Sequence, residues 1–298
     1  MNKNSLSYHL PRLLHQLGRP IKFGNHRFKI AGYYPCRFTN TSDQHERFLE
    51  AILRRVLETG HGTFIDVGVN AGQTLAKVLG IDKHRAYVGF EPQLSCCFNA
   101  DQFIKNNGLV NAQVLPIALG DSNQLLSFFS ESEMDECASL IERTGLCGDR
   151  TKTFVQCRIG DEVIKELGIS SISVIKIDVE GAEVQVMEGL RETLELYQPA
   201  IIFEVLPNFS GIGARTWHSP EACEINRESA KRIRELLHQL EYQIFQINEE
   251  SGKESKIDDF ELDNINNFQG SNFIAYPKLL YTNPVEQLTH TASQTSAI

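Results

Sequence analysis

The sequence has little of several features that mark particular classes of protein. Its 298 residues include one tryptophan and seven cysteines, and 29 Lys+Arg against 38 Asp+Glu give a formal net charge of −9. No apolar run approaches the ~18–20 residues that a membrane-spanning helix needs. The polar N-terminus also lacks the apolar core of a signal peptide. We therefore expect a soluble, cytoplasmic protein without a transmembrane segment.

The shortage of basic residues and the pattern of cysteines exclude two further classes. An excess of acidic side chains argues against a long basic groove for nucleic acid, so we expect no nucleic-acid partner. The cysteines form no C-x-x-C pair, and free thiols in a reducing compartment are the expectation. Cys137, Cys147 and Cys157 recur regularly, but no histidine neighbours them at the spacing of a zinc site. We therefore predict no metal site.

Short apolar segments alternate with amphipathic ones from residue 63 onward. We expect strands at 63–67, 86–90, 112–115, 125–129, 154–158, 173–177, 200–205, 242–247 and 272–276, with helices at 71–79, 94–107, 161–167 and 182–197 and around 230–240. Strands joined by crossover helices form a mainly parallel sheet with helices on both faces. The last two strands are joined only by the acidic residues 246–270, which we interpret as a solvated connection, so these strands can pair antiparallel.

The chain divides into three regions. Residues 1–42 form an N-terminal extension that holds a leucine-rich helical stripe and a hairpin around Gly24-Asn25. This extension offers a surface through which two copies would pair as a homodimer. Residues 43–280 form the main α/β domain, and residues 281–298 read as a disordered tail.

The first strand of the series ends in a turn that suits a ligand. The sequence Asp66-Val67-Gly68-Val69-Asn70-Ala71-Gly72 runs from this strand straight into a helix. Glycines let the backbone approach a ligand closely, and the start of a helix offers free N–H groups. Glu91 ends the second strand about 20 residues further on, where an acidic side chain accepts hydrogen bonds from both hydroxyls of a ribose.

Two cofactors compete for this turn. An NAD site requires G-x-G-x-x-G with a diphosphate above the helix. Here only Gly68 and Gly72 are present, and the carboxylate of Asp66 would repel a diphosphate but suits an ammonium group. S-adenosylmethionine (SAM) carries ribose, amine and carboxylate without phosphate, so the pattern favours SAM over NAD. The remaining alternative is that the two glycines only shape a turn.

Charged residues gather at the end of the strand that contains Lys176. Lys176 and Asp178 point to the same side of the sheet, Glu180 and Glu183 follow, and Glu204 ends the next strand. A buried, unpaired lysine costs roughly several kcal/mol, so Asp178 or Glu204 is its expected counter-charge. One interpretation is a structural ion pair, with Glu183 capping a helix. The other is a catalytic floor on which Asp178 and Glu180 act as bases.

Five stretches of the sequence together resemble a known family. They are Asp66-Val67-Gly68-Val69-Asn70-Ala71-Gly72, Phe90-Glu91-Pro92, Ala118-Leu119-Gly120, Ala138-Ser139-Leu140 and Ile175-Lys176-Ile177-Asp178-Val179-Glu180-Gly181-Ala182-Glu183. These stretches resemble the successive motifs of the FkbM family of SAM-dependent methyltransferases. The resemblance spans roughly residues 61–276, and the stretch that begins at Lys176 is its most specific part.

The resemblance implies a fold, a cofactor and a reaction. The fold is the Rossmann-like class I methyltransferase fold, a mainly parallel seven-stranded sheet with a reversed last strand and helices on both faces. The cofactor is SAM, and the methyl group goes to a hydroxyl of a small-molecule or glycan acceptor such as a sugar, glycolipid or secondary metabolite. The cofactor-binding residues are Asp66, Val67, Gly68, Asn70, Gly72, Glu91, Ala118 and Asp178. The catalytic residues are Lys176, Asp178 and Glu180.

Two long connections are expected to build the acceptor pocket. Residues 130–152 and 206–226 are longer than ordinary loops, and loops of this length are usually lids or binding loops. Trp217 in the second connection would stack on a sugar ring, and His218 beside it is another candidate base; both residues also fit ordinary loop packing.

Two alternative functions stay open at this point. One is a methyltransferase of the same fold that acts on nitrogen or on a carboxylate. The other is a SAM-binding module without catalytic activity that regulates a partner. The presence of Asp66, Glu91 and Asp178 argues against a degenerate site.

Overall fold

The computed structural model of the chain describes residues 19–30, 47–130, 151–205, 220–260 and 270–278. The expected N-terminal helical stripe, most of the two long connections with Trp217 and His218, and the C-terminal tail lie outside these residues. None of the helices in the described ranges combines the length and the apolar character that crossing a bilayer requires.

Seven of the predicted strands form a central sheet together with one further strand. Its members are β3 (Thr63–Val67), β4 (Tyr87–Phe90), β5 (Ala112–Leu115), β9 (Ile172–Ile177), β10 (Ala200–Glu204), β11 (Tyr242–Ile247), β12 (Glu254–Ile257) and β13 (Asn272–Pro277). Within the described residues the order is β12-β11-β13-β10-β9-β3-β4-β5. The neighbours from β10 to β5 are parallel, whereas β13 is antiparallel to both β10 and β11. The parallel sheet with a reversed last strand is therefore confirmed.

An eighth strand extends the expected seven. Residues 246–270 were expected to be only a solvated connection, but they contain β12, which pairs antiparallel with β11. Side-chain contacts from other elements hold this strand in place: the hydroxyl of Tyr276 donates to the Glu254 carboxylate at 3.0 Å, and Arg55 forms an ion pair with the same group. Ile257 also packs against the core. Such long-range contacts leave no signal in a local acidic pattern.

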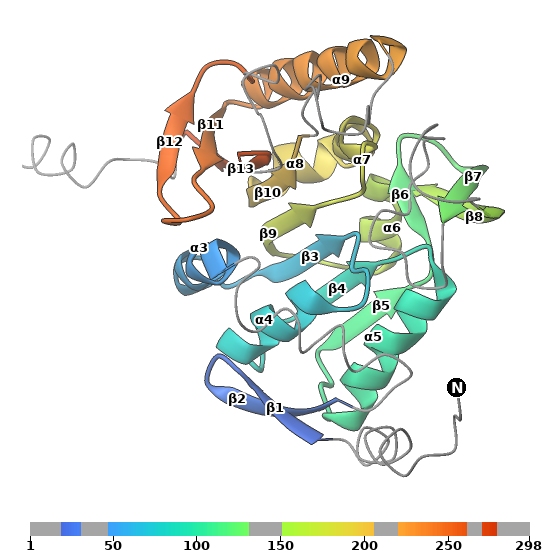
Figure 1. Ribbon diagram of the computed structural model, residues 1–298, viewed down its shortest axis with the longest axis vertical. Coiled ribbons are helices and arrows are strands. Elements are labelled where there is room, and N and C mark those ends of the chain that lie inside the picture. Colours follow the sequence, from blue (N-terminus) through green and yellow to red (C-terminus); the bar gives the residue numbers. More distant parts are fainter. Residues whose placement is uncertain (1–18, 31–46, 131–150, 206–219, 261–269, 279–298) are drawn as a thin grey trace, which may run out of the picture.

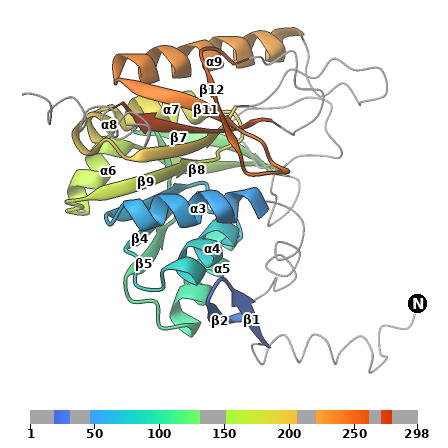
Figure 2. The same ribbon diagram turned by 90° about the vertical axis from the view of Figure 1, so that its left-hand side faces the viewer.

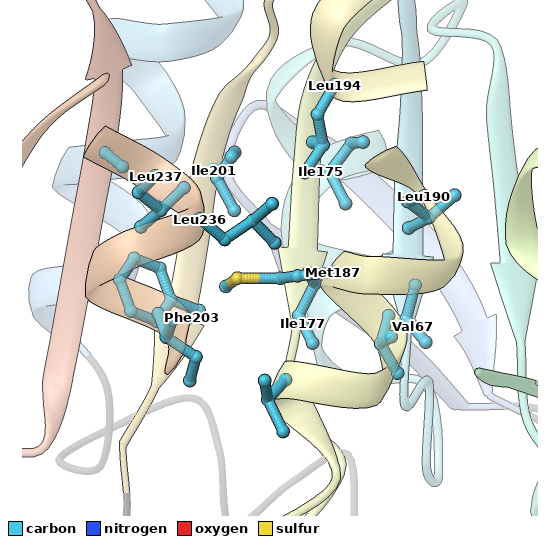
Figure 3. Close-up of a cluster of buried hydrophobic side chains, with 14 of the residues drawn as sticks. Val67, Ile175, Ile177, Met187, Leu190, Leu194, Ile201, Phe203, Leu236 and Leu237 are labelled. Atoms are coloured by element: carbon cyan, nitrogen blue, oxygen red, sulfur yellow. The ribbon is translucent and has the colours of Figure 1, made fainter. Parts of the chain in front are cut away.

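Helices cover both faces of the sheet (Figures 1 and 2). On one face lie α3 (Arg47–Thr59), α4 (Gln73–Ile81) and α5 (Leu94–Asn106). On the other face lie α6 (Gly160–Glu166), α7 (Glu183–Gly189), α8 (Arg191–Tyr197) and α9 (Pro220–Gln239). Each face has its own apolar cluster because successive residues of a strand point to opposite sides. Figure 3 shows the cluster on the face covered by α6, α7, α8 and α9, where Met187 of α7 lies among Ile177, Phe203 and Leu236.

The single helix expected at 182–197 is in fact two, α7 and α8. The backbone leaves the helical conformation at Leu190, whose φ is −107° and ψ is 14°, and the Leu190 side chain is fully buried. The new helix start is capped from a distance, because the Asp161 carboxylate accepts the N–H groups of Glu192 and Thr193 at 2.9 and 2.8 Å. Asp161 belongs to α6, so the periodicity of residues 182–197 does not reveal this break.

A second, smaller sheet lies beside the carboxyl ends of the central strands. It consists of β6 (Ala118–Gly120), β8 (Thr151–Ile159) and β7 (Gln124–Ser130) in that order. β7 and β8, which pair antiparallel, confirm the strands predicted at 125–129 and 154–158, whereas β6, which pairs parallel with β8, was not expected.

The predicted hairpin around Gly24-Asn25 is formed by β1 (Arg19–Phe23) and β2 (His26–Ile30). It packs on α4 and α5, where the ring of Phe28 lies 5.3 Å from that of Phe103. Asn107 bonds the backbone of Lys29 twice, at 2.7 and 2.9 Å. The hairpin therefore shares one apolar core with the main domain.

Candidate functional site

A pocket opens at the carboxyl ends of β3, β4 and β9. Open α/β sheets bind ligands at this edge. The residues predicted for the site that line this pocket are Val67, Gly68, Asn70, Glu91, Ala118, Asp178 and Glu180. Asp66, Gly72 and Lys176 are not among the lining residues.

The turn after β3 depends on the glycine at its centre. Gly68 has a φ of 90°, and a Cβ at this position would lie 1.9 Å from the carbonyl oxygen of Asp178. The N–H of Asp178 donates in turn to the carbonyl of Val67 at 3.0 Å. Gly68 thus lets the ends of β3 and β9 touch, which brings two predicted motifs to one wall of the pocket.

Glu91 is a buried acid at the end of β4. Its side chain accepts the N–H of Asn70 at 2.7 Å and that of Gln93 at 2.8 Å, one on each oxygen. Burial raises the pKa of Glu91 from its ordinary value of 4.5 to about 7, although the two backbone hydrogen bonds oppose the rise. Each carboxylate oxygen has a further lone pair, so Glu91 is still able to accept two hydroxyl groups.

Asp66 lies beneath the turn rather than in the pocket. Its side chain is fully buried, and the hydroxyl of Tyr87 donates to its carboxylate. Burial, together with the negative charge of Asp66, raises the pKa of Tyr87 well above 10. In the sheet register Asp66 is the neighbour of Lys176. These contacts make Asp66 a support of the turn and of the pocket floor.

Lys176 and Asp178 form an ion pair of 2.8 Å. The side chain of Lys176 is 8% exposed, whereas that of Asp178 is 36% exposed and reaches the pocket. Of the two counter-charges considered from the sequence, Asp178 therefore forms the close contact. A paired lysine at this depth holds the Asp178 carboxylate in one position at the end of β9.

The loop after β9 has a strained backbone that a buried acid stabilises. Glu180 has a φ of 56°, a left-handed conformation that is costly for a residue with a side chain. The buried Glu183 accepts the N–H groups of Val179 and Gly181 at 3.2 and 3.1 Å, and burial raises its pKa. Glu183 therefore shapes the loop that presents Asp178 and Glu180.

A third carboxylate joins Asp178 and Glu180. Carboxylate oxygens of Asp178, Glu180 and Glu204 all lie within 4.8 Å of one another. Glu204 ends β10 and accepts the hydroxyl of Ser271 at 2.7 Å. Burial and the charges of Asp178 and Glu180 raise the pKa of Glu204 well above its ordinary value. Such a cluster attracts a positive charge, whether it belongs to a sulfonium, an ammonium group or a metal ion.

Part of the pocket wall is apolar, and sequence reasoning missed some of its residues. Phe90, Leu119 and Phe128 line it, and all three are buried. Leu119 and Phe128 come from β6 and β7 of the small sheet. Only the motif that contains Ala118 hinted at their position, because the packing of the small sheet against the pocket depends on long-range contacts.

Comparison with known proteins places the chain in a family. The family model described as the methyltransferase FkbM domain matches residues 66–244. No curated protein matches the chain.

Three solved structures illustrate the likeness. The FkbM methyltransferase from Methylobacillus flagellatus KT is 13% identical with a TM-score of 0.43, and the match covers 72% of this chain but 43% of that one. A putative caffeoyl-CoA O-methyltransferase from Staphylococcus aureus is 11% identical, covers 80% and 87%, and has a TM-score of 0.47. An O-methyltransferase from Bacillus cereus in complex with SAH is 11% identical, covers 80% and 86%, and has a TM-score of 0.42. On the family match, this chain belongs to the FkbM methyltransferase family.

Proposed function

We propose that this protein is a SAM-dependent methyltransferase that methylates a hydroxyl group of a sugar, glycolipid or secondary metabolite. The observation that carries the proposal is the charge of the pocket. Glu91, Asp178 and Glu180 line it, and no lysine, arginine or histidine of the described residues does so. A pocket of this kind favours a cationic ligand and disfavours a diphosphate.

The lining residues fit the ribose, the adenine and the positively charged groups of SAM. Glu91 would hold the ribose hydroxyls, and the apolar wall of Phe90, Leu119 and Phe128 would take the adenine. The carboxylates of Asp178 and Glu180 would face the positive charges of the amino acid part. When bound, SAM supplies an activated methyl group on a sulfonium. NAD has neither the ammonium nor the sulfonium group and carries a diphosphate, so the same lining argues against it.

The residues of the chain supply position and a proton acceptor. Holding a hydroxyl oxygen in line with a methyl carbon contributes much of the rate, because effective molarities reach on the order of 10⁵ M or more. A hydroxyl also loses its proton on methylation. Asp178 and Glu180 line the pocket as acceptors for that proton, and Lys176 keeps Asp178 in place.

Binding and turnover of the full chain test this function. Titration calorimetry should show SAM and its demethylated product binding, and NADH should bind more weakly than SAM. Release of the demethylated product should then be measured with matched panels of hydroxyl, amine and carboxylate acceptors, among which the hydroxyl compounds should turn over fastest. Tighter binding of NADH than of SAM would contradict the cofactor. SAM binding without turnover of any acceptor would favour a regulatory module.

Two isosteric variants test the catalytic carboxylates. Asp178→Asn and Glu180→Gln conserve volume, so the chain should still fold, while loss of a general base should lower kcat by ~10²–10⁴-fold. The rates should be compared at saturating SAM because Asp178 also faces the cofactor. Asp101→Asn, on the exposed side of α5 in an ion pair with Lys105, is the control. A normal kcat with a lowered melting temperature would show a structural role instead.

A further inference from the structure

Glu204 lies behind the two carboxylates to which the proposed reaction assigns proton transfer. It ends β10, the strand beside β9, and its carboxylate lies within 4.8 Å of those of Asp178 and Glu180. It does not line the pocket, so contact with an acceptor is left to the other two acids. Ser271, the residue before β13, donates its hydroxyl to the Glu204 carboxylate, which helps to hold that carboxylate in place.

We propose that Glu204 is a positioning residue for proton removal and that it acts on the acceptor's proton through Asp178 and Glu180. This proposal rests on the methyl transfer proposed above. In the reaction the acceptor's O–H bond breaks and its oxygen forms a bond to the methyl carbon. The carbon–sulfur bond breaks, and its electron pair stays on sulfur. The proton passes to an oxygen of Asp178 or Glu180, is shared with Glu204 across the cluster, and leaves to water when the product departs.

The charged groups around Glu204 explain why it would share the acceptor's proton. The charged groups around it are Asp178, Glu180 and Glu183, and Lys176 is in an ion pair with Asp178 at 2.8 Å. Glu183 is engaged by backbone N–H groups. Carboxylates this close do not all ionise at their ordinary pH, because each negative charge disfavours the next. The cluster therefore retains a shared proton as the pH rises and binds an incoming proton more strongly than a lone acid.

The structure also gives the direction of the pH dependence. Burial and the negative charges of Asp178 and Glu180 raise the pKa of Glu204. Turnover should then rise with pH as the cluster loses its shared proton. Removing the carboxyl group of Glu204 takes away the group that holds this proton, so the rise in turnover should begin at lower pH, and the acceptor's proton should be removed less efficiently.

The test is the pH profile of kcat at saturating SAM, with release of the demethylated product from a panel of methyl glycosides and polyols. In Glu204→Gln the rise of kcat on the acidic side of the profile should move to lower pH by about one unit. The maximal kcat should fall roughly three- to tenfold. Glu204→Asp keeps the carboxyl group, so its kcat should rise at nearly the same pH as that of the wild type. Glu249→Gln is the matched control: Glu249 accepts the side chain of Asn272 at 2.9 Å but is not part of the cluster.

Each outcome bears on one claim. If kcat of Glu204→Gln rises at the same pH as that of the wild type, the role of Glu204 is overturned, even where the melting temperature is lowered. The methyltransferase assignment would stay intact. Activity that EDTA abolishes and Mg²⁺ restores would also overturn it, because the carboxylates would then bind metal rather than protons. No turnover of any acceptor by the wild type would reject the proposed function itself and this role with it.

Discussion

The buried acid Glu91 should make the stability of the free protein fall as the pH rises. Its pKa is about 7 in the folded chain and has an ordinary value of 4.5. The folded state therefore binds the proton more tightly than the unfolded state does. The stabilisation is fully present below about pH 4.5 and is lost as the pH rises through 7. With about 1.4 kcal/mol for each pKa unit, the loss between pH 5 and pH 8 is about 2–3 kcal/mol.

The perturbation is Glu91→Gln, which has the same shape but no titrating proton. Urea unfolding at pH 5 and at pH 8 gives the free energy of unfolding for the wild type and for the variant. The wild type should lose about 2–3 kcal/mol more than the variant between the two pH values. The other titrating groups contribute equally to the pH dependence of both proteins, so their effect cancels when the two changes in free energy are compared. A loss of a backbone hydrogen bond in the variant that is the same at both pH values cancels as well. Asp101→Asn should keep the slope of the wild type.

The affinity for SAM should change in the opposite direction over the same pH range. A carboxylate accepts hydroxyl hydrogen bonds better than a carboxylic acid does, so SAM should bind more tightly as Glu91 ionises. Glu91→Gln should weaken binding roughly 10–150-fold at pH 8, which corresponds to ~1.5–3 kcal/mol. The amine of SAM also titrates, but equally for both proteins. Parallel stability slopes together with unchanged affinity would refute the reasoning about Glu91.

Three further predictions concern how the fold supports the site. Gly68→Ala should lower both stability and SAM affinity, because its Cβ would meet the Asp178 carbonyl at 1.9 Å. Gly168→Ala is its control, with a φ of +63° and nothing within 4 Å; equal losses of SAM affinity would contradict the close-approach argument. Asp161→Ala should uncap α8 and cost about 0.5–2 kcal/mol in urea unfolding with kcat unchanged. Phe28→Ala should cost about 3–5 kcal/mol if the hairpin belongs to the core, and two separate unfolding transitions would argue that it does not.

The sequence by itself determined the architecture and where most of the site lies. The alternation of apolar strands and amphipathic helices requires a parallel sheet, and a parallel sheet places all its carboxyl ends along one edge. The motifs that contain Gly68, Glu91 and Asp178 follow three such strands, so they meet at one pocket whatever the loops do. The pairing of Lys176 with an acid also followed from the cost of burying a lone charge.

Tertiary contacts alone decided which of these side chains reach the pocket. Asp66 belongs to the same motif as Gly68, yet it points down to Tyr87 instead of into the pocket. Glu204 joins Asp178 because β10 lies beside β9, and the apolar wall that includes Phe128 depends on how the small sheet packs. The break at α8 and the edge strand β12 are likewise held by partners distant in the chain. The local periodicity of the sequence predicts which face of a strand or helix a residue occupies. Its partners depend on contacts between segments that are distant in the sequence.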